Sequence, residues 1–158
     1  MWHRIGKDGK KYWGEKGAGF LFTDGDHILI LRRAETHNKD TWGLPGGKTE
    51  PGENPYATAK RETEEEIGRM PTQVQRIGKF EEKDGLHSWT TFIMRVNKPF
   101  GNIHLNKEHS DWRWVPINTI LGYKLHPNLK ENIKRYVHFI SLKIPRKFRD
   151  WMEAMKAL

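Results

Sequence analysis

The sequence predicts an α/β protein in which helices flank a mixed β-sheet. Three observations lead to this fold class: apolar segments typical of strands, segments with helical periodicity, and no strict alternation of strands with helices. A wholly parallel sheet would require that alternation. At 158 residues without an internal repeat, the chain has the size of a single domain.

Two strands precede the first helix. Residues 18–23 (AGFLFT) and 27–33 (HILILRR) are apolar runs joined by the short turn DGD, which predicts two strands with a tight connection. A loop is expected at 34–40. The stretch WGLPGG at 42–47, rich in glycine and proline, follows that loop.

Three strands and a helix follow in the second half of the chain. Residues 74–82 and 88–96 are strand-like and are separated by the turn KDGLH, and residues 111–117 form a short strand leading into a helical turn. In residues 128–140 the apolar positions lie four, four and three residues apart, which indicates a helix.

The clearest element is a helix over residues 55–67. Asn54 can cap its start, and Pro55 has the backbone angle that the first helical position needs. Gly68 is a typical stop after the last turn. At about 100° per residue, the inner face of this helix comprises Tyr56, Ala59, Thr63 and Ile67.

The same helix gathers negative charge on another side. Glu62, Glu65 and Glu66 share an arc of about 100°, away from the inner face, although like charges at this spacing repel. Arg61 lies four residues before Glu65 and can orient it, but a single cation does not neutralise three anions. Clustered carboxylates suit Mg²⁺, or Mn²⁺ in its place. The alternative from geometry alone is a solvated acidic face.

Charge and composition limit the classes of protein to consider. The chain has 28 Lys and Arg against 20 Asp and Glu, a net charge of +8, which suits an anionic partner or a solvated surface. It has no cysteine, so disulfides and thiolate metal sites are excluded. It also lacks a long apolar run and the apolar segment of a signal peptide, so we expect a cytoplasmic protein with no membrane partner.

The stretch from residue 47 to residue 69 resembles the Nudix box, G-x5-E-x7-R-E-U-x-E-E-x-G-U, in which U is a bulky apolar residue. Thr63 and Arg69 depart from it at two apolar positions, which affects local packing rather than chemistry. The segments LILRR, WGLPGG and DWRWVPI are also similar to the family. All charged and glycine positions of the box match, at Gly47, Glu53, Arg61, Glu62, Glu65, Glu66 and Gly68.

Resemblance to the MutT/Nudix hydrolases implies an α/β/α sandwich with a loop–helix–loop catalytic motif. It also implies Mg²⁺-dependent hydrolysis of a nucleoside diphosphate linked to another group. Divalent ions neutralise the charge of a pyrophosphate and lower the pKa of a bound water. Carried over by position, the metal ligands would be Glu62, Glu65 and Glu66, with Glu53 through a water and the carbonyl of Gly46 or Gly47.

The same resemblance suggests the catalytic residues. Glu65 would act in catalysis as well as in metal binding, and Arg61 would orient the glutamates without touching the substrate. Glu108 lies six residues before Trp114, where some relatives carry a functional glutamate, so it is a candidate base or further ligand. A solvated loop acid is the alternative for Glu108, and the neighbouring His109 is a weaker candidate.

Three residues are candidates for substrate binding. Arg32 ends a predicted strand beside Arg33, and since side chains alternate along a strand, at most one of the two should face the site. Trp42 could stack on a base, although an aromatic residue is as often part of the core. Asn128 lies where relatives that cleave nucleoside triphosphates read the base, but asparagine is also a common helix cap.

The leading expectation for function is hydrolysis of a nucleoside triphosphate, unmodified or oxidised, to the monophosphate and pyrophosphate. Removal of pyrophosphate from RNA 5′ ends is an alternative, because the basic C-terminal region could hold an RNA backbone. Family branches acting on ADP-ribose or dinucleoside polyphosphates carry a Pro or Tyr beyond the box, where DGLH at 84–87 argues mildly against both. An inactive domain that senses nucleotide or RNA is the alternative from a different class.

The domain organisation follows from the extent of the resemblance. Residues 1–140 form the expected hydrolase domain, and residues 141–158 form a basic C-terminal helical extension. The extension could pack on the domain, bind an acidic partner or mediate a homodimer.

Overall fold

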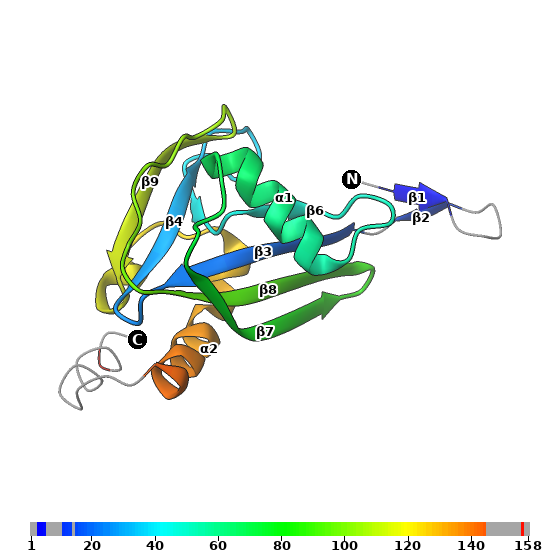
Figure 1. Ribbon diagram of the computed structural model, residues 1–158. Helices are drawn as coiled ribbons and strands as arrows, with labels where there is room; N and C mark the ends of the chain where they lie inside the picture. Colours follow the sequence, from blue (N-terminus) through cyan, green and yellow to red (C-terminus); the bar gives the residue numbers. More distant parts are fainter. Residues whose placement is uncertain (1–2, 6–10, 14, 145–155, 157–158) are drawn as a thin grey trace.

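The computed structural model describes residues 3–5, 11–13, 15–144 and 156, and its centre is one twisted mixed sheet (Figure 1). A separate two-stranded sheet, which the sequence did not predict, pairs β1 (His3–Ile5) with β2 (Lys11–Trp13). The seven strands of the main sheet are β3 (Glu15–Thr23), β4 (His27–Arg33), β5 (Trp42–Gly43), β6 (Gly46–Lys48), β7 (Val74–Asp84), β8 (His87–Val96) and β9 (His109–Pro116).

The order of strands confirms the mixed sheet. The path runs β5-β4-β3-β8-β7, with β6 also paired to β3 and β9 to β4. In the described part of the chain, β3 and β8 run parallel, whereas the remaining pairs of this sheet are antiparallel. The parallel pair joins strands far apart in the sequence, which leaves room for a helix between them.

The first two expected strands form with the tight connection that the sequence predicts. The turn DGD joins β3 and β4, but these strands share a single register pair, Thr23 with Ile28. The rest of β4 pairs with β9, and β3 instead pairs with β6 at Gly17–Gly19. The glycine- and proline-rich stretch at 42–47 takes part in the sheet, because β5 lies at its start and β6 at its end.

The helix expected over residues 55–67 forms as the sequence predicted. Helix α1 (Pro55–Ile67) begins after Asn54, whose side chain accepts a hydrogen bond from the backbone N–H of Ala57 at 2.8 Å. It ends at Gly68, whose positive φ of 97° is the left-handed conformation that glycine adopts without strain. Both caps satisfy backbone groups that a helix end leaves unpaired.

The last helix begins one residue before the predicted start and ends three residues beyond the predicted end. The 3-10 helix η1 (Ile117–Gly122) supplies the predicted helical turn, and α2 (Pro127–Lys143) follows it. Helix α2 thus continues past residue 140, where the sequence placed the start of the extension. Residues 145–155 and 157–158 of that extension lie outside the described residues.

The two helices cover opposite faces of the sheet, as Figure 1 shows for α1 in front and α2 behind. The alternation of side chains along β4 creates these faces, since odd and even positions point to opposite sides. The α1 face includes Phe20, Phe22, Leu29, Leu31, Ala59, Ile67, Phe92 and Met94. The α2 face includes Leu21, Ile28, Ile30, Ile93, Leu129, Ile133, Tyr136, Val137 and Ile140.

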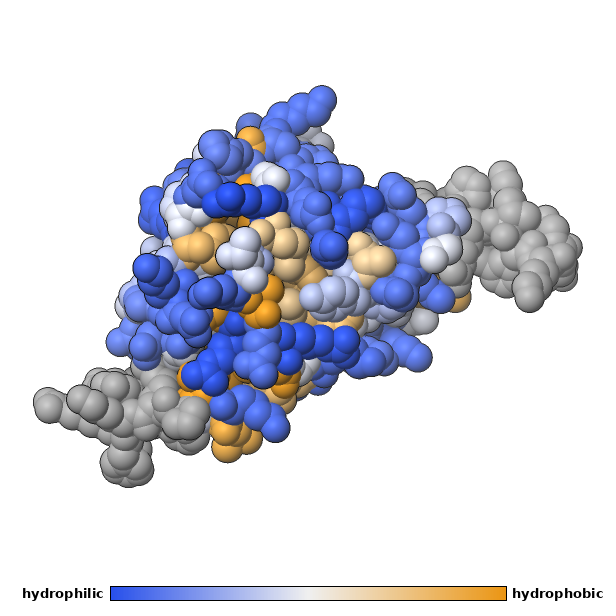
Figure 2. Space-filling view, in the orientation of Figure 1, coloured by the Kyte–Doolittle hydropathy of each residue, from blue (hydrophilic) through white to orange (hydrophobic). Residues whose placement is uncertain are grey.

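The surface in Figure 2 is mostly hydrophilic, in agreement with a sequence in which 30% of the residues are charged. On the face that Figure 2 shows, hydrophilic side chains predominate, and hydrophobic ones gather near the centre. Within the described residues, neither α1 nor α2 is long and apolar enough to cross a membrane.

The helical wheel of α1 is correct for three core positions and wrong for one glutamate. Ala59, Thr63 and Ile67 are buried, and Tyr56 is partly buried against the ring of Phe20. Glu66, however, is only 1% exposed, although the wheel placed it away from the core. The wheel describes an isolated helix, whereas the folded chain covers this flank.

Thr63 shows the consequence of a polar residue at an apolar position of the motif. Its side chain is fully buried, and its hydroxyl has no hydrogen-bond partner among the described residues. The hydroxyl of Thr58, one turn earlier and equally buried, donates to Glu53 at 3.0 Å and contacts Thr49 at 3.1 Å. A buried hydroxyl without a partner destabilises the fold.

Thr63→Val should therefore raise the free energy of unfolding by about 1 kcal/mol, because valine fills the same space without an unpaired hydroxyl. Thr58→Val is the matched control and should lower it by about 1–3 kcal/mol, because Glu53 loses a hydrogen bond. Urea unfolding followed by circular dichroism measures both values. A loss of stability in Thr63→Val similar to that in Thr58→Val would contradict the assignment.

Candidate active site

Arg61 is the centre of a network that joins α1 to the loop before it. Its Nε donates to Glu53 at 2.8 Å, and one terminal nitrogen contacts Glu62 at 2.9 Å and Glu65 at 3.3 Å. The other terminal nitrogen donates to the carbonyl of Lys48 at 2.9 Å. A planar guanidinium can serve several acceptors at once, so Arg61 links three glutamates to one another.

Glu53 belongs mainly to this network. Its two oxygens accept four hydrogen bonds, from Arg61 twice, from the Thr58 hydroxyl and from the Glu50 backbone N–H. The hydrogen bond from Arg61, followed by that from the Glu50 backbone, lowers the pKa of Glu53 to about 2. The structure thus ties Glu53 to the loop, and its role as a water-mediated metal ligand stays a prediction.

Glu62 lies against the backbone of β6. A Cβ at Gly47 would overlap the Glu62 carboxylate, so glycine is required for this close approach. Burial raises the pKa of Glu62, and the negative charges of Glu65 and Glu108 raise it further against the opposing effect of Arg61. These charges therefore act on one another across the gap between α1 and the start of β9. The carbonyl of Gly47 as a ligand stays a prediction.

Glu66 lies deepest in the site. Its Oε1 accepts a hydrogen bond from the Gly46 backbone N–H at 2.8 Å, and its Oε2 lies 3.2 Å from Nδ1 of His109. Burial raises the pKa of Glu66 well above its usual range, and the charges of Glu62 and Glu108 raise it further. Glu66 is thus a buried acid held by β6 and facing β9.

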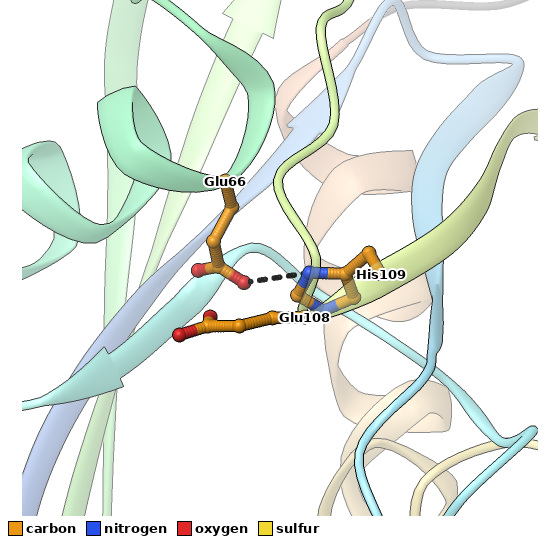
Figure 3. Close-up of side chains that lie close together, drawn as sticks. All are labelled: Glu66, Glu108 and His109. Atoms are coloured by element: carbon orange, nitrogen blue, oxygen red, sulfur yellow. Dashed lines mark ion pairs between the residues drawn. The ribbon is translucent and has the colours of Figure 1, made fainter.

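Glu108 and His109 reach this acid from the other side of the site. Figure 3 shows Glu66 descending from α1, while Glu108 and His109 extend toward it from the start of β9. Their ligand atoms all lie within 4.8 Å of one another. Burial, together with the charge of Arg33, lowers the pKa of His109 to about 4. This arrangement can accept a divalent cation, because carboxylate oxygens and a neutral imidazole are metal ligands.

Of the two neighbouring arginines, Arg33 has the charge that influences this cluster, although Arg32 was the predicted contact. The charge of Arg33 acts on the pKa of both Glu66 and His109. Arg32 shares the face of Ile30, and its guanidinium lies 3.4 Å from Asp40. Alternation along the strand allowed a choice between the two arginines, but it did not say which face α1 would cover. Contact of either arginine with a phosphate stays a prediction.

Trp42 is a core residue rather than an open stacking platform. It is 7% exposed, its ring meets Tyr123 edge-on, and the guanidinium of Arg113 lies 5.1 Å from the ring centre. Burial leaves little of the ring for a substrate. The stacking role proposed for Trp42 therefore lacks geometric support, and packing explains its presence.

Asn128 is the second residue of α2 and does not cap it. The cap is His126, whose Nδ1 accepts a hydrogen bond from the Asn128 backbone N–H at 3.2 Å. The Asn128 carbonyl accepts from the side chain of Asn132 at 2.8 Å. The partly exposed side chain of Asn128 is therefore not needed for capping, and its role in base recognition stays a prediction.

Comparison with known proteins places this fold and site in one family. The model of the NUDIX domain matches residues 15–138. A crystal structure of a Nudix hydrolase from M. smegmatis, RenU, superimposes with a TM-score of 0.72 at 25% identity, covering 92% of this chain and 98% of that one. The chain therefore belongs to the Nudix hydrolase family, and the predicted family and α/β fold are confirmed.

Two curated relatives indicate the range of the family. The chain is 31% identical over 140 residues to a nucleoside triphosphate pyrophosphatase/Nudix hydrolase fusion protein of Bifidobacterium longum. That match covers 81% of this chain but only 29% of the relative's length. The chain is also 24% identical over 151 residues to an RNA pyrophosphohydrolase of Pelagibacter ubique, covering 77% of this chain and 92% of the relative.

The buried cap of α2 should make stability depend on pH. Burial first, and then the charges of Arg33 and His37, lower the pKa of His126 from 6.5 to about 4. The unfolded chain therefore binds the proton more tightly than the folded chain. Protonation of His126 should not change the free energy of unfolding above about pH 6.5. Between about pH 6.5 and pH 4, the free energy of unfolding should fall by up to about 1.4 kcal/mol for each pH unit, and below about pH 4 it should level off.

His126→Asn should reduce that slope, because the asparagine oxygen also caps a helix but does not titrate. Denaturant unfolding at several pH values between 4 and 7 measures the slope. His138→Asn, which changes an exposed histidine of the same helix, is the control and should keep the slope of the wild type. His109 contributes in the same direction, so part of the slope should remain in His126→Asn. An unchanged slope in that variant would contradict the role of the cap.

Proposed function

We propose that this protein hydrolyses a pyrophosphate bond in a nucleoside diphosphate derivative, with a divalent cation as cofactor. The substrate favoured here is a nucleoside triphosphate, unmodified or oxidised. Water adds to one phosphorus, the bridging P–O bond breaks, and a monophosphate and pyrophosphate leave. Membership of the family supports hydrolysis of nucleotide derivatives, and the choice of bond is part of our proposal.

The observation that carries this proposal is the convergence of carboxylates that repel one another. Glu65 and Glu108 raise the pKa of Glu62, and Glu62 and Glu108 raise that of Glu66. The fold holds these groups together, although Arg61 is the one cation in direct contact with Glu62 and Glu65 among the described residues. A protein keeps such a costly arrangement where a cation or a proton is needed for function.

The donor set fits a divalent cation. Glu62, Glu66 and Glu108 would hold it, with Glu65 on the open side of the site, and the buried Nδ1 of His109 has no hydrogen-bond partner among the described residues. Bound there, the cation would supply charge neutralisation for the phosphates and activation of a water. We keep Mg²⁺ as the expected ion for catalysis, with Mn²⁺ as its substitute.

The protein's own residues would do three further things. Arg33 would add a positive charge at the edge of the site, where an anionic phosphate must enter. Arg61 would hold the glutamates in place without touching the substrate. Glu108, partly exposed beside Glu66, is our candidate to accept the proton of the attacking water, since it contacts the site from a different element than the ligands of α1.

Glu65→Gln should lower kcat by a factor of about 10² or more with little change in stability, because it removes one charge from a half-exposed position. Glu64→Gln is the matched control, since Glu64 lies on the same helix with nearly the same exposure, 49% against 50%, and pairs with Lys60. It should keep the activity of the wild type. Hydrolysis is measured on a panel of nucleoside triphosphates, ADP-ribose and dinucleoside polyphosphates with added Mg²⁺.

The panel also decides between the enzyme and an inactive sensor. Release of pyrophosphate with monophosphate supports the proposed bond, whereas release of inorganic phosphate would show attack at the terminal phosphorus. Equal inactivity of the wild type and Glu65→Gln on every compound would overturn the enzymatic proposal. Nucleotide or RNA binding without turnover would then favour the sensor.

A second candidate substrate is RNA carrying a 5′ triphosphate, and helix α2 supplies the observation. Lys130 and Lys134 are both exposed and lie four residues apart, so they share one side of the helix. Lys143 is also exposed, but it lies nine residues after Lys134 and therefore on the opposite side of the helix. Two neighbouring cations on a helix suit a polyanionic backbone, which a mononucleotide lacks.

If RNA is the substrate, Lys130→Gln combined with Lys134→Gln should lower kcat/KM on a 5′-triphosphorylated oligonucleotide and leave that on a nucleoside triphosphate unchanged. The slope of log kcat/KM against log salt concentration should become shallower by about two, about one for each lysine. Lys79→Gln combined with Lys98→Gln removes two other exposed cations as a control. Identical salt slopes in both double variants would exclude this surface.

A further inference from the structure

His109 is buried, and one of its ring nitrogens lacks a hydrogen bond within the described residues. It is 8% exposed, and its Nδ1 has no hydrogen-bond partner in the described part of the chain. Buried polar atoms without a partner are rare in folded proteins, because their lost hydration is not replaced. Figure 3 shows the ring directed at the carboxylate of Glu66, and the ligand atoms of Glu66, Glu108 and His109 lie within 4.8 Å of one another. The nitrogen thus points into the cluster rather than into the core.

The backbone holds His109 in this position. It pairs with Arg33 across the β4–β9 ladder, and the carbonyl of Glu108 accepts a hydrogen bond from the Ala34 N–H at 2.8 Å. The backbone N–H of Glu108 donates to the side chain of Asn106 at 3.0 Å. Glu108 and His109 are therefore delivered by one anchored segment, and their placement does not depend on a loose loop.

The distance between His109 and Glu66 matches a shared ion. Nδ1 and Oε2 are 3.2 Å apart but do not form a hydrogen bond of good geometry. Two ligands about 2.1 Å from an octahedral ion and at right angles to each other lie about 3.0 Å apart. A lone pair on Nδ1 facing a carboxylate oxygen is unfavourable without a cation or proton between them. The observed separation is therefore close to that of adjacent ligands.

We propose that His109 supplies a nitrogen ligand to this site beside the carboxylates of Glu66 and Glu108, and that the site therefore prefers a first-row transition ion to Mg²⁺. Mg²⁺ takes oxygen ligands almost exclusively, whereas imidazole suits transition ions. A mixed set of oxygens and one nitrogen shifts the balance toward Mn²⁺ and the ions that follow it in the Irving–Williams order. The proposal rests on the metal site of the proposed function and adds the class of ion that it selects.

The direct test uses Mn²⁺ as the probe and the unmutated full-length protein. Electron spin-echo envelope modulation of bound Mn²⁺ should show coupling to a ¹⁴N nucleus. In protein made with ¹⁵N-labelled histidine, the ¹⁴N coupling should be replaced by that of ¹⁵N. This readout needs neither activity nor a variant, so a folding defect does not affect it. Bound Mn²⁺ without nitrogen coupling would overturn the proposal.

A variant then assigns the nitrogen to one residue. His109→Gln should lose the coupling and lower the affinity for Mn²⁺ about tenfold relative to that for Mg²⁺, measured by competition in the same spectra. His104→Gln changes an exposed histidine of the preceding loop and should keep both the coupling and the wild-type preference. Coupling that survives in His109→Gln would overturn the assignment.

The spectra test His109 as a metal ligand and the hydrolysis assays test the proposed function, so either hypothesis can be rejected without the other. Nitrogen coupling without turnover would leave the metal ligand in place and remove the proposed function. Turnover that depends on Glu65 but occurs at a site without nitrogen coupling would keep the function and remove His109 as a ligand.

Discussion

The contact between Arg61 and its ring of carboxylates is the interaction on which the rest of the site depends. Arg61 contacts Glu53 in the loop and both Glu62 and Glu65 on the helix, so one guanidinium fixes the position of the loop relative to α1. The attraction offsets only part of the repulsion among the acids. The remainder is borne by the fold, which brings the charges together because the backbone of β6 and β9 leaves them no other position.

The sheet determines where that repulsion is concentrated. β6 pairs with β3 and presents Gly46 and Gly47 to the helix, so that one glutamate gains a backbone hydrogen bond and another a close contact. β9 pairs with β4 and brings Glu108 and His109 to the opposite side of the gap. The site is thus built from three elements that are distant in sequence.

The distribution of charge now has a physical explanation. A chain with a net charge of +8 keeps its convergent acids at one place, beside Arg33 and on the α1 face of the sheet. Exposed lysines of α2 lie on the other face, where they are free to meet a longer anionic substrate. The positive surface attracts an anion, and the acidic cluster attracts a cation. Both attractions serve the same substrate, because a metal–polyphosphate complex contains an anion and a cation.

The sequence by itself determined the local structure and the chemistry of the motif. Asn54, Pro55 and Gly68 defined α1 to the residue, because caps act through neighbouring backbone groups, and the spacing of the acids pointed to a metal site. Tertiary structure alone decided that Glu66 is buried, that the charge of Arg33 influences the acidic cluster, that Trp42 is in the core and that His109 meets Glu66. Each of these depends on which face of a strand or helix another element covers, and that choice is made by packing across the whole chain rather than by neighbours in sequence.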